Sequence, residues 1–391
     1  MNKRPFIILS AFLLLFSLIE KGQATETYRP ETSVAGFIQL PGSGRQVYNF
    51  NPGWRFFRGD VRGAEVVNFD DRSWNVVSTP HTVELMPAEG SGCRNYQGPA
   101  WYRKHFVLPA ETKGQRVVLH FEAAMGKQIL YLNGKRIQEH LGGYLPFTLD
   151  LTANGVQAGD SCLLAVFTDN SDDKSYPPGK RQYTLDFAYH GGIYRDVWMI
   201  AKSPVAITDA IDSQTVGGGG VFIHFDKISE KSAQVYVNTE VQNDDARSES
   251  VTVETTLTDA DGKVIKRSSG KLSLKPGEKK SICQQMEVKN PTLWSPDTPY
   301  LYRVQSRIKK GNKSIDGGIT RVGIRLAEFR GKDGFWLNGK PFGQLVGANR
   351  HQDFAYVGNA LPNSQQWRDA KRLRDAGCTI IRVAHYPQDP A

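Results

Sequence analysis

The chain has 391 residues, a formal net charge of +9 and four cysteines. Its basic residues lie in short, scattered clusters such as Lys279-Lys280, which indicates a solvated surface rather than a nucleic-acid-binding stripe. No CxxC spacing is present, which argues against structural zinc and favours buried free thiols over a disulfide framework. The four cysteines are Cys93, Cys162, Cys283 and Cys378.

Residues 1–24 have the pattern of a cleaved signal peptide. Lys3 and Arg4 precede an almost wholly apolar run over residues 5–19, and Gly22-Gln23-Ala24 supplies small residues for cleavage. The apolar run is shorter than the ~20 residues that a membrane-spanning helix needs. We therefore expect a secreted or periplasmic protein without a membrane span and without a nucleic-acid partner. An uncleaved anchor is the alternative.

An all-β domain is predicted over residues 46–203, after a polar, flexible leader at residues 25–45. Asn133-Gly134 separates two apolar runs and predicts a tight hairpin turn, because both residues tolerate positive φ angles. Many short strands with Gly and Pro turns are typical of a jelly-roll sandwich. The clearest strands are expected at residues 101–107, 116–121, 128–132 and 163–168.

A second all-β domain is predicted over residues 204–327. Its length is near the ~100 residues of an immunoglobulin-type sandwich, so we expect seven strands. Residues 217–220 are all glycine, and we interpret them as a turn because no helix follows that could complete a phosphate-binding loop. Alternating apolar and polar residues predict strands at 234–242, 250–258, 279–288, 301–309 and 314–321, with a turn at 259–262.

The third domain, residues 328–391, changes from period two to a helical period. Apolar residues recur every three positions from Trp367 onward, which predicts a helix over residues 364–376 that ends at Gly377. A hairpin at residues 331–340 and strands at residues 342–347 and 379–383 complete the expected elements. This βαβ order implies neighbouring parallel strands with a right-handed crossover. The fold class expected for the whole chain is mainly β: a jelly roll, an Ig-like sandwich and the first two βα elements of a (β/α)8 TIM barrel.

Polar side chains cluster where these two parallel strands end. Asn349-Arg350-His351 comes after the first predicted strand, while Arg382 and His385 lie at and just past the end of the second. Carboxyl ends of parallel strands meet at one edge of a sheet, where α/β folds place their sites. Two histidines on adjacent strands favour a site, although a single one would be read as an ordinary loop residue.

Four segments of the chain carry a family resemblance: NPGWRF at 51–56, DFAYHGGIYRDV at 186–197, NPTLWSP with PYLY at 290–302, and GANRH at 347–351 with RVAHYP at 382–387. Together, in this order, they resemble glycoside hydrolase family 2, which contains β-galactosidases, β-glucuronidases and β-mannosidases. The resemblance implies a jelly roll, an Ig-like sandwich and a (β/α)8 barrel, in agreement with the elements predicted above.

The resemblance also implies roles for individual residues. Asp186 is expected to reach into the sugar pocket, where a carboxylate can accept several hydroxyl protons. Arg350 and Arg382 are expected to hold carboxylates ionised. The plainer alternatives are a loop-capping aspartate and ordinary salt bridges. The implied substrate-binding set is Asp186, Asn349, Arg350, His351, Arg382 and His385, with no metal ligand among them.

The chain departs from the family pattern at Gln352-Asp353, where relatives carry glutamate after Asn-Arg-His. This substitution puts a charge or metal role there in doubt, and Mg²⁺, Na⁺ or Ca²⁺ stays open as an assisting ion. The resemblance places both catalytic glutamates on the fourth and seventh barrel strands, beyond Ala391. We therefore expect the chain alone to be inactive and residues beyond about Lys340 to be poorly stable. Asp369 and Asp375 are expected to be solvated.

The leading hypothesis is a secreted enzyme of this family that hydrolyses terminal β-galactosides with retention, with carbohydrate as substrate and a homo-oligomer left open. Residues 350–353 look closest to secreted bacterial β-galactosidases, whereas Gly142 to Phe147 look like the β-glucuronidase branch. The alternatives are a β-glucuronidase or other family 2 exo-glycosidase, a structural or adhesion protein, and a non-catalytic carbohydrate-binding protein. The last would use aromatic residues such as Trp54, Trp74, Tyr96 and Trp101.

Overall fold

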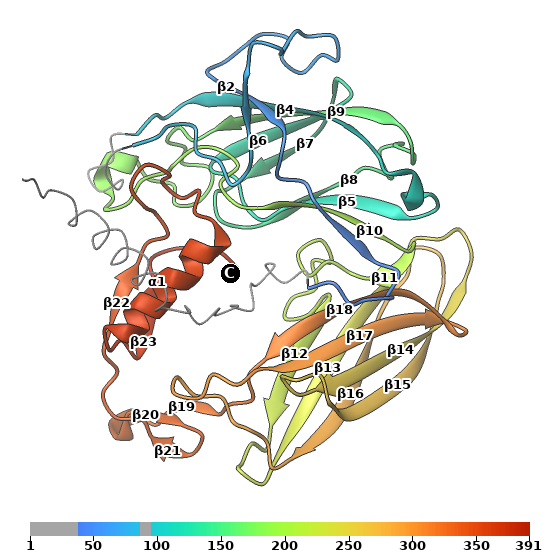
Figure 1. Cartoon of the computed structure of the whole chain (residues 1–391), viewed down its shortest axis with the longest axis vertical. Coiled ribbons are helices and arrows are strands. Elements are labelled where there is room, and N and C mark those ends of the chain that lie inside the picture. The colour runs from blue at the N-terminus through green and yellow to red at the C-terminus, as the bar shows by residue number, and fades with distance from the viewer. Residues whose placement is uncertain (1–37, 87–94) are drawn as a thin grey trace, which may run out of the picture. The chain divides into compact units, whose positions relative to one another are not determined.

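The computed structural model describes residues 38–86 and 95–391 (Figure 1). Strands dominate these ranges, and α1 (Asn363–Asp375) is the single α-helix in them. The expected fold class is confirmed, with two β-sandwiches followed by the start of a parallel βαβ unit. In the described ranges no helix is long and apolar enough to cross a bilayer. The predicted signal peptide lies outside the described residues.

The first sandwich packs two antiparallel sheets against each other. One sheet has the order β3-β2-β4-β9-β6-β7 and the other β1-β10-β5-β8. Aromatic and branched residues from both sheets fill the core, with Trp54, Tyr102 and Leu119 fully buried. The strands are β1 (Gln46–Asn49), β2 (Trp54–Arg58), β3 (Asn75–Val77), β4 (Pro99–Val107), β5 (Arg116–Phe121), β6 (Lys127–Leu132), β7 (Lys135–Leu141), β8 (Phe147–Asp150), β9 (Ser161–Asp169) and β10 (Val197–Lys202).

The hairpin predicted at Asn133-Gly134 is confirmed. These two residues connect β6 to β7 with φ angles of 51° and 82°, the left-handed values that a tight hairpin requires. The tryptophans that a carbohydrate-binding protein could have used are instead in the interior: Trp54, Trp74 and Trp101 are all buried. The hypothesis that these three residues stack on sugars in a carbohydrate-binding protein is therefore wrong, because their apolar surface is part of the sandwich core.

The second sandwich has eight strands rather than the expected seven. β16 pairs with one edge of β13, while β11 and β12 pair one after the other along its opposite edge. Residues 208–220 therefore form an insertion within what is in effect a single edge strand. The strands are β11 (Val205–Ile207), β12 (Val221–Asp226), β13 (Ser232–Asn243) and β16 (Lys279–Lys289) in one sheet, and β14 (Glu249–Thr258), β15 (Val264–Leu274), β17 (Tyr302–Lys310) and β18 (Lys313–Val322) in the other.

The third part begins with a small sheet made of β19 (Ala327–Phe329), β20 (Phe335–Leu337) and β21 (Lys340–Pro341). Next come β22 (Gly347–Arg350), α1 and β23 (Ile380–Val383), and β22 pairs with β23 in parallel as predicted. The helix prediction is confirmed to within one residue at each end, and Gly377 follows it with a φ of 91°.

The strand expected at residues 342–347 is placed wrongly, since β22 begins where that prediction ended. The Phe342 amide donates to the Phe335 carbonyl, which ties this part of the chain to the small sheet. At Gly347, a Cβ atom would lie 1.8 Å from the Ile380 carbonyl oxygen. Glycine therefore permits the close backbone approach with which the β22–β23 pair starts.

The prediction of buried cysteines is confirmed for Cys162 and wrong for Cys283, which is exposed on β16. Cys378 is half-buried, and all three of these thiols are free. Cys283 faces outward because strand alternation buries its neighbours Gln284 and Met286 instead. Cys93 lies outside the described residues.

Candidate functional site

The loop from Leu185 to β10 presents Asp186 to solvent from a rigid base. Phe187, Ala188 and Tyr189 directly after it are buried, whereas the Asp186 side chain is 75% exposed. The Tyr189 amide donates to Gln182 Oε1 at 2.5 Å, and Asn170 Nδ2 donates to the Tyr189 carbonyl at 2.6 Å. An exposed carboxylate at the tip of such a fixed loop suits ligand recognition better than loop capping.

Two histidines meet this carboxylate. His351 is the first residue after β22, and His385 is the second residue after β23. His385 Nε2 lies 3.8 Å from Asp186 Oδ1, and one donor or acceptor atom from each of the three side chains lies within 4.8 Å of the others. The structure thus brings together three residues that are up to 199 positions apart in the chain. We call Asp186, His351 and His385 the rim cluster.

Aromatic rings form the floor beneath the rim cluster. The Phe187 ring lies 5.6 Å from the His351 ring at an interplanar angle of 27°, and 5.8 Å from the His385 ring. Tyr386 stacks on Tyr144 with ring centroids 4.3 Å apart, and its hydroxyl lies 3.4 Å from His351 Nδ1. Burial raises the pKa of Tyr386 well above its usual value, so this hydroxyl stays neutral. The floor restricts how the His351 imidazole can turn.

Strand alternation separates the other expected site residues into two groups. Asn349 and Arg382 are register partners on β22 and β23, and Arg382 Nη1 donates to Asn349 Oδ1 at 3.3 Å. Arg350 points to the opposite face, because successive residues of a strand alternate. There it donates to Gln366 Oε1 at 2.5 Å and to Asp369 Oδ2 at 3.0 Å.

The Arg350–Asp369 contact corrects one expectation. Asp369 was expected to be solvated, but its side chain is only 18% exposed and forms an ion pair. Arg350 thus matches the plainer alternative of a structural salt bridge that holds α1 against β22. Asp375 is exposed as expected and pairs with Lys371 one helical turn away.

A buried polar network that sequence reasoning missed centres on Arg195. Its guanidinium donates to the Tyr144 carbonyl at 3.2 Å, to Gln352 Oε1 at 3.0 Å and to the Pro387 carbonyl at 2.7 Å. Gln352 Oε1 also accepts from the Asp389 amide at 2.8 Å. The neutral Gln352 is therefore a buried structural acceptor. The only signal for Arg195 was its place inside the motif at residues 186–197.

Asp196, the next residue of this motif, links two further segments. Asn51 Nδ2 donates to one carboxylate oxygen at 2.8 Å, and Asn363 Nδ2 at the start of α1 donates to the other at 3.0 Å. Arg195 and Asp196 thus fasten the barrel segment to the first sandwich. This attachment holds the histidines opposite Asp186.

The rim cluster does not fit two of the ions left open by the family resemblance, Mg²⁺ and Ca²⁺. Mg²⁺ and Ca²⁺ are held by six or more oxygen ligands, whereas this cluster offers one carboxylate and two imidazoles. Gln352, which replaces an acidic residue, is buried and already accepts two hydrogen bonds. These side chains therefore do not form a site for either of these two cations.

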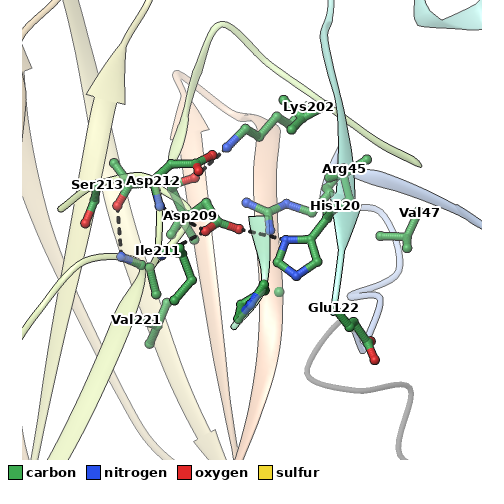
Figure 2. A pocket seen from close by; sticks show the side chains of 18 of the residues that line it. Arg45, Val47, His120, Glu122, Lys202, Asp209, Ile211, Asp212, Ser213 and Val221 are labelled. Atoms are coloured by element: carbon green, nitrogen blue, oxygen red, sulfur yellow. Dashed lines mark hydrogen bonds and ion pairs between the residues drawn. The ribbon is translucent and has the colours of Figure 1, made fainter. Parts of the chain in front are cut away.

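A separate cavity of about 540 Å³ lies between β1, β5 and β10 of the first sandwich and the 208–220 insertion of the second. Figure 2 shows His120 directed at Asp209, with Nδ1 and Oδ2 3.3 Å apart. Burial raises the pKa of Asp209, but His120 and nearby amides bring it down to about 2. Arg45 forms a two-pronged ion pair with Asp316 at 2.8 Å.

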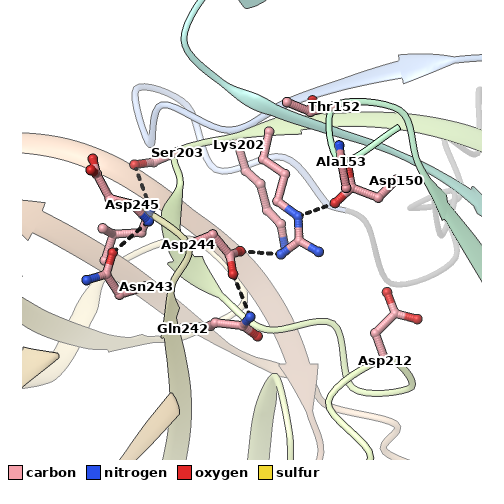
Figure 3. A network of polar contacts seen from close by, with 12 residues as sticks. Asp150, Thr152, Ala153, Lys202, Ser203, Asp212, Gln242, Asn243, Asp244 and Asp245 are labelled. Atoms are coloured by element: carbon pink, nitrogen blue, oxygen red, sulfur yellow. Dashed lines mark hydrogen bonds and ion pairs between the residues drawn. The ribbon is translucent and has the colours of Figure 1, made fainter. Parts of the chain in front are cut away.

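The charges around this cavity are largely paired across the two sandwiches. Arg116 forms ion pairs with Asp150 of the first sandwich and with Asp244 of the second. Figure 3 shows these two carboxylates turned toward one guanidinium. Lys202 donates to the Ile207 carbonyl at 3.1 Å, and burial lowers its pKa to about 8. These contacts join the sandwiches, so we assign the cavity a structural role.

Comparison with known proteins defines the class. Residues 66–204 match the model of the glycosyl hydrolases family 2 sugar binding domain, residues 219–325 that of glycosyl hydrolases family 2, and residues 329–391 that of the family 2 TIM barrel domain. These are the domains of a glycoside hydrolase, in the order that the fold shows. The three ranges together cover most of the chain, and the chain belongs to glycosyl hydrolase family 2.

Similar proteins carry two different names. The chain is 34% identical over 346 residues to a beta-galactosidase of Thermoanaerobacter pseudethanolicus, covering 88% of this chain and 44% of that protein. It is 32% identical over 370 residues to a beta-glucuronidase of Formosa agariphila, covering 90% and 37%. A solved structure of Bacteroides uniformis beta-glucuronidase 2, covalently bound to cyclophellitol-6-carboxylate aziridine, is similar with a TM-score of 0.79 and 32% identity, covering 88% and 40%. The chain thus spans less than half the length of these relatives.

Proposed function

We propose that the protein carrying this chain is an exported β-glycosidase that removes terminal β-galactosides from oligo- or polysaccharides with retention of configuration. The observation that carries this proposal is the rim cluster, in which a solvent-facing carboxylate meets two imidazoles at the ends of parallel barrel strands. Export rests on the charged and apolar pattern of residues 1–24.

The rim cluster supplies the chemistry of sugar recognition. The Asp186 carboxylate accepts hydrogen bonds from two neighbouring hydroxyls at once, and the imidazole nitrogens can donate hydrogen bonds to sugar hydroxyls or accept them. The Phe187 and Tyr386 floor restricts the His351 imidazole before the sugar arrives, which reduces the entropy lost on binding. The cluster therefore orients a non-reducing terminal sugar by its hydroxyls.

Residues 329–391 hold neither of the reacting glutamates that the family resemblance implies for this mechanism. Retaining hydrolysis uses two carboxyl groups about 5–5.5 Å apart, one as acid and base and one as nucleophile. Residues 329–391 contain no glutamate, while the family resemblance assigns both roles to glutamates of later barrel strands. We infer that this chain binds the sugar without cleaving it.

A β-glucuronide is the second candidate substrate, because the similar proteins carry both names. A glucuronate adds a negative charge, which Asp186 would repel unless a cation faces it. The exposed Arg382 guanidinium, beside Asn349, is the candidate cation, since Arg350 is already committed to Asp369. The Asp186 carboxylate favours the neutral galactoside.

Sugar binding by the chain tests this assignment. Amide chemical shifts of the isotope-labelled chain would be followed during titration with galactose and, separately, with glucuronate. We expect galactose to perturb residues near His351 and His385, and Asp186→Asn to weaken binding about tenfold or more, because a charge-assisted hydrogen bond is worth about 1.5–3 kcal/mol. An aryl β-galactoside should not be hydrolysed.

Asp261→Asn is the matched control, since Asp261 is an exposed turn residue of the second sandwich. Equal galactose binding by Asp186→Asn and the unaltered chain would contradict the recognition role. Preferential binding of glucuronate would select the second candidate, and turnover of the aryl galactoside would overturn the inference that the chain does not cleave.

A further inference from the structure

The donor atoms of the rim cluster are those of a transition-metal site. Two imidazoles and one carboxylate come from three separate segments and converge from different directions. Oxygen-seeking cations such as Mg²⁺ and Ca²⁺ avoid such a set, whereas imidazole suits Zn²⁺, Ni²⁺ and Cu²⁺. Three protein ligands with a fourth position open to water are typical of zinc sites that stay accessible.

The distances are close to what such an ion needs. Zinc binds nitrogen and oxygen at about 2.0–2.2 Å in a tetrahedron, which places neighbouring ligand atoms roughly 3.4 Å apart. In the rim cluster, His385 Nε2 and Asp186 Oδ1 are 3.8 Å apart, and all three ligand atoms lie within 4.8 Å of one another. Side-chain rotation is enough to close these gaps, because Asp186 and His385 are both exposed.

The surroundings hold the third ligand in place. His351 lies over the Phe187 ring, and the Tyr386 hydroxyl lies 3.4 Å from its Nδ1. Hydrogen-bonding and packing partners of this kind orient metal-binding imidazoles in proteins. The site thus combines one anchored ligand with two that can adjust to an arriving ion.

We propose that Asp186, His351 and His385 bind one zinc-class divalent cation, with water completing its coordination, and that this ion excludes the sugar. The exclusion rests on the proposed function, because it requires the same three side chains to recognise the hydroxyls of the substrate. Ion binding does not rest on it. The rim cluster would then be closed to substrate by free Zn²⁺ at concentrations that fill the site.

Cobalt and zinc titrations of the full chain test ion binding. Co²⁺ at the rim cluster should give the intense visible bands of four- or five-coordinate cobalt, and Zn²⁺ should displace it with a stoichiometry of one. The exposed and half-buried thiols Cys283 and Cys378 are other candidate ligands, so the measurements use the Cys283→Ser, Cys378→Ser background. Absence of the bands, or a featureless weak binding isotherm, would overturn the proposal.

Substitution of the two histidines tests whether zinc binds at the rim cluster. His385→Gln and His351→Gln should each lower Zn²⁺ affinity about tenfold or more, since even the loss of a partner that merely supports a ligand costs about 10–100-fold. His224→Gln is the control, because His224 lies on β12 of the second sandwich with its ring stacked on Tyr236 at 4.8 Å. Unchanged affinity in both rim variants would rule this site out.

Competition between Zn²⁺ and galactose distinguishes the proposed metal site from the proposed sugar-binding function. Galactose binding is measured with and without saturating Zn²⁺, and we expect Zn²⁺ to abolish the shift changes that the sugar causes. Zinc binding without any galactose binding would uphold the metal site and contradict the proposed function. Galactose binding that is insensitive to bound Zn²⁺ would contradict the exclusion.

Discussion

Arg195 shows how a single buried charge positions a site that it does not touch. Its guanidinium reaches the Tyr144 carbonyl of the first sandwich and, on the barrel side, Gln352 and the Pro387 carbonyl. Pro387 lies two residues from His385, and Gln352 is adjacent to His351. The spacing between Asp186 and the two histidines therefore depends on this cation.

Replacing Arg195 by alanine should destabilise the chain by about 2–4 kcal/mol, because several buried acceptors lose their donor at once. Urea denaturation followed by tryptophan fluorescence measures this change. Arg72→Ala serves as the control, since Arg72 forms an exposed pair with Asp70 and should show no measurable change. Similar stability of the two variants would refute a structural role for Arg195.

The pair of parallel strands is the element on which the histidines depend. β22 approaches β23 closely enough at Gly347 that no side chain fits there. The Thr379 amide donates to the Val346 carbonyl, and the Ala384 amide donates to the Arg350 carbonyl, at the two ends of the pair. Val346, Ile380 and Val383 are all exposed, so few apolar contacts support this pairing.

Gly347→Ala should separate the strands, because the new Cβ would overlap the Ile380 carbonyl oxygen. We expect amide exchange at Thr379 and Ala384 to accelerate about tenfold or more, which corresponds to about 1.4 kcal/mol of local opening free energy. Gly318→Ala is the matched control, since a Cβ there meets nothing within 4 Å. If both variants exchange alike, the close approach at Gly347 does not limit the pairing.

Elements with a strong local pattern could be predicted from the sequence, and those set by distant contacts could not. The Asn133-Gly134 hairpin and α1 carry their own turn and periodicity signals. The start of β22 was misplaced because residues 342–346 look like a strand, whereas the Phe342 amide hydrogen-bonds to the Phe335 carbonyl of β20. The predicted strand also ended before Arg350, so the direction of this side chain toward α1 was not predicted. The role of Arg195 depends on partners more than 150 residues away, such as Gln352, which no local pattern encodes.

At the scale of the whole molecule, buried charges make stability depend on pH. Glu122 lines the cavity between the sandwiches (Figure 2), and Trp198 Nε1 donates to its Oε1 at 2.8 Å. Burial raises the pKa of Glu122 to about 8, helped by nearby Asp196 and Asp389. The folded chain therefore holds a proton that the unfolded chain has released above its ordinary pKa of 4.5.

It follows that Glu122 weakens the fold progressively between about pH 5 and 8, by roughly 1.4 kcal/mol per pH unit. Glu122→Gln removes this effect while retaining the oxygen that Trp198 needs. We expect the variant to gain stability over the unaltered chain as pH rises from 5 to 8, measured by denaturant unfolding at each pH. A difference that stays constant over this range would refute the raised pKa.

The rim cluster draws one residue from the first sandwich and two from the barrel segment. A ligand bound at the rim cluster therefore contacts both the first sandwich and the barrel segment, and it stabilises the interface between them. Ligand binding and the stability of this interface are thus linked: the free energy that a bound ligand contributes is added to the free energy needed to open the interface. Mutations that destabilise this interface, even far from the rim cluster, will weaken ligand binding. A bound ligand will raise the melting temperature because it stabilises the interface.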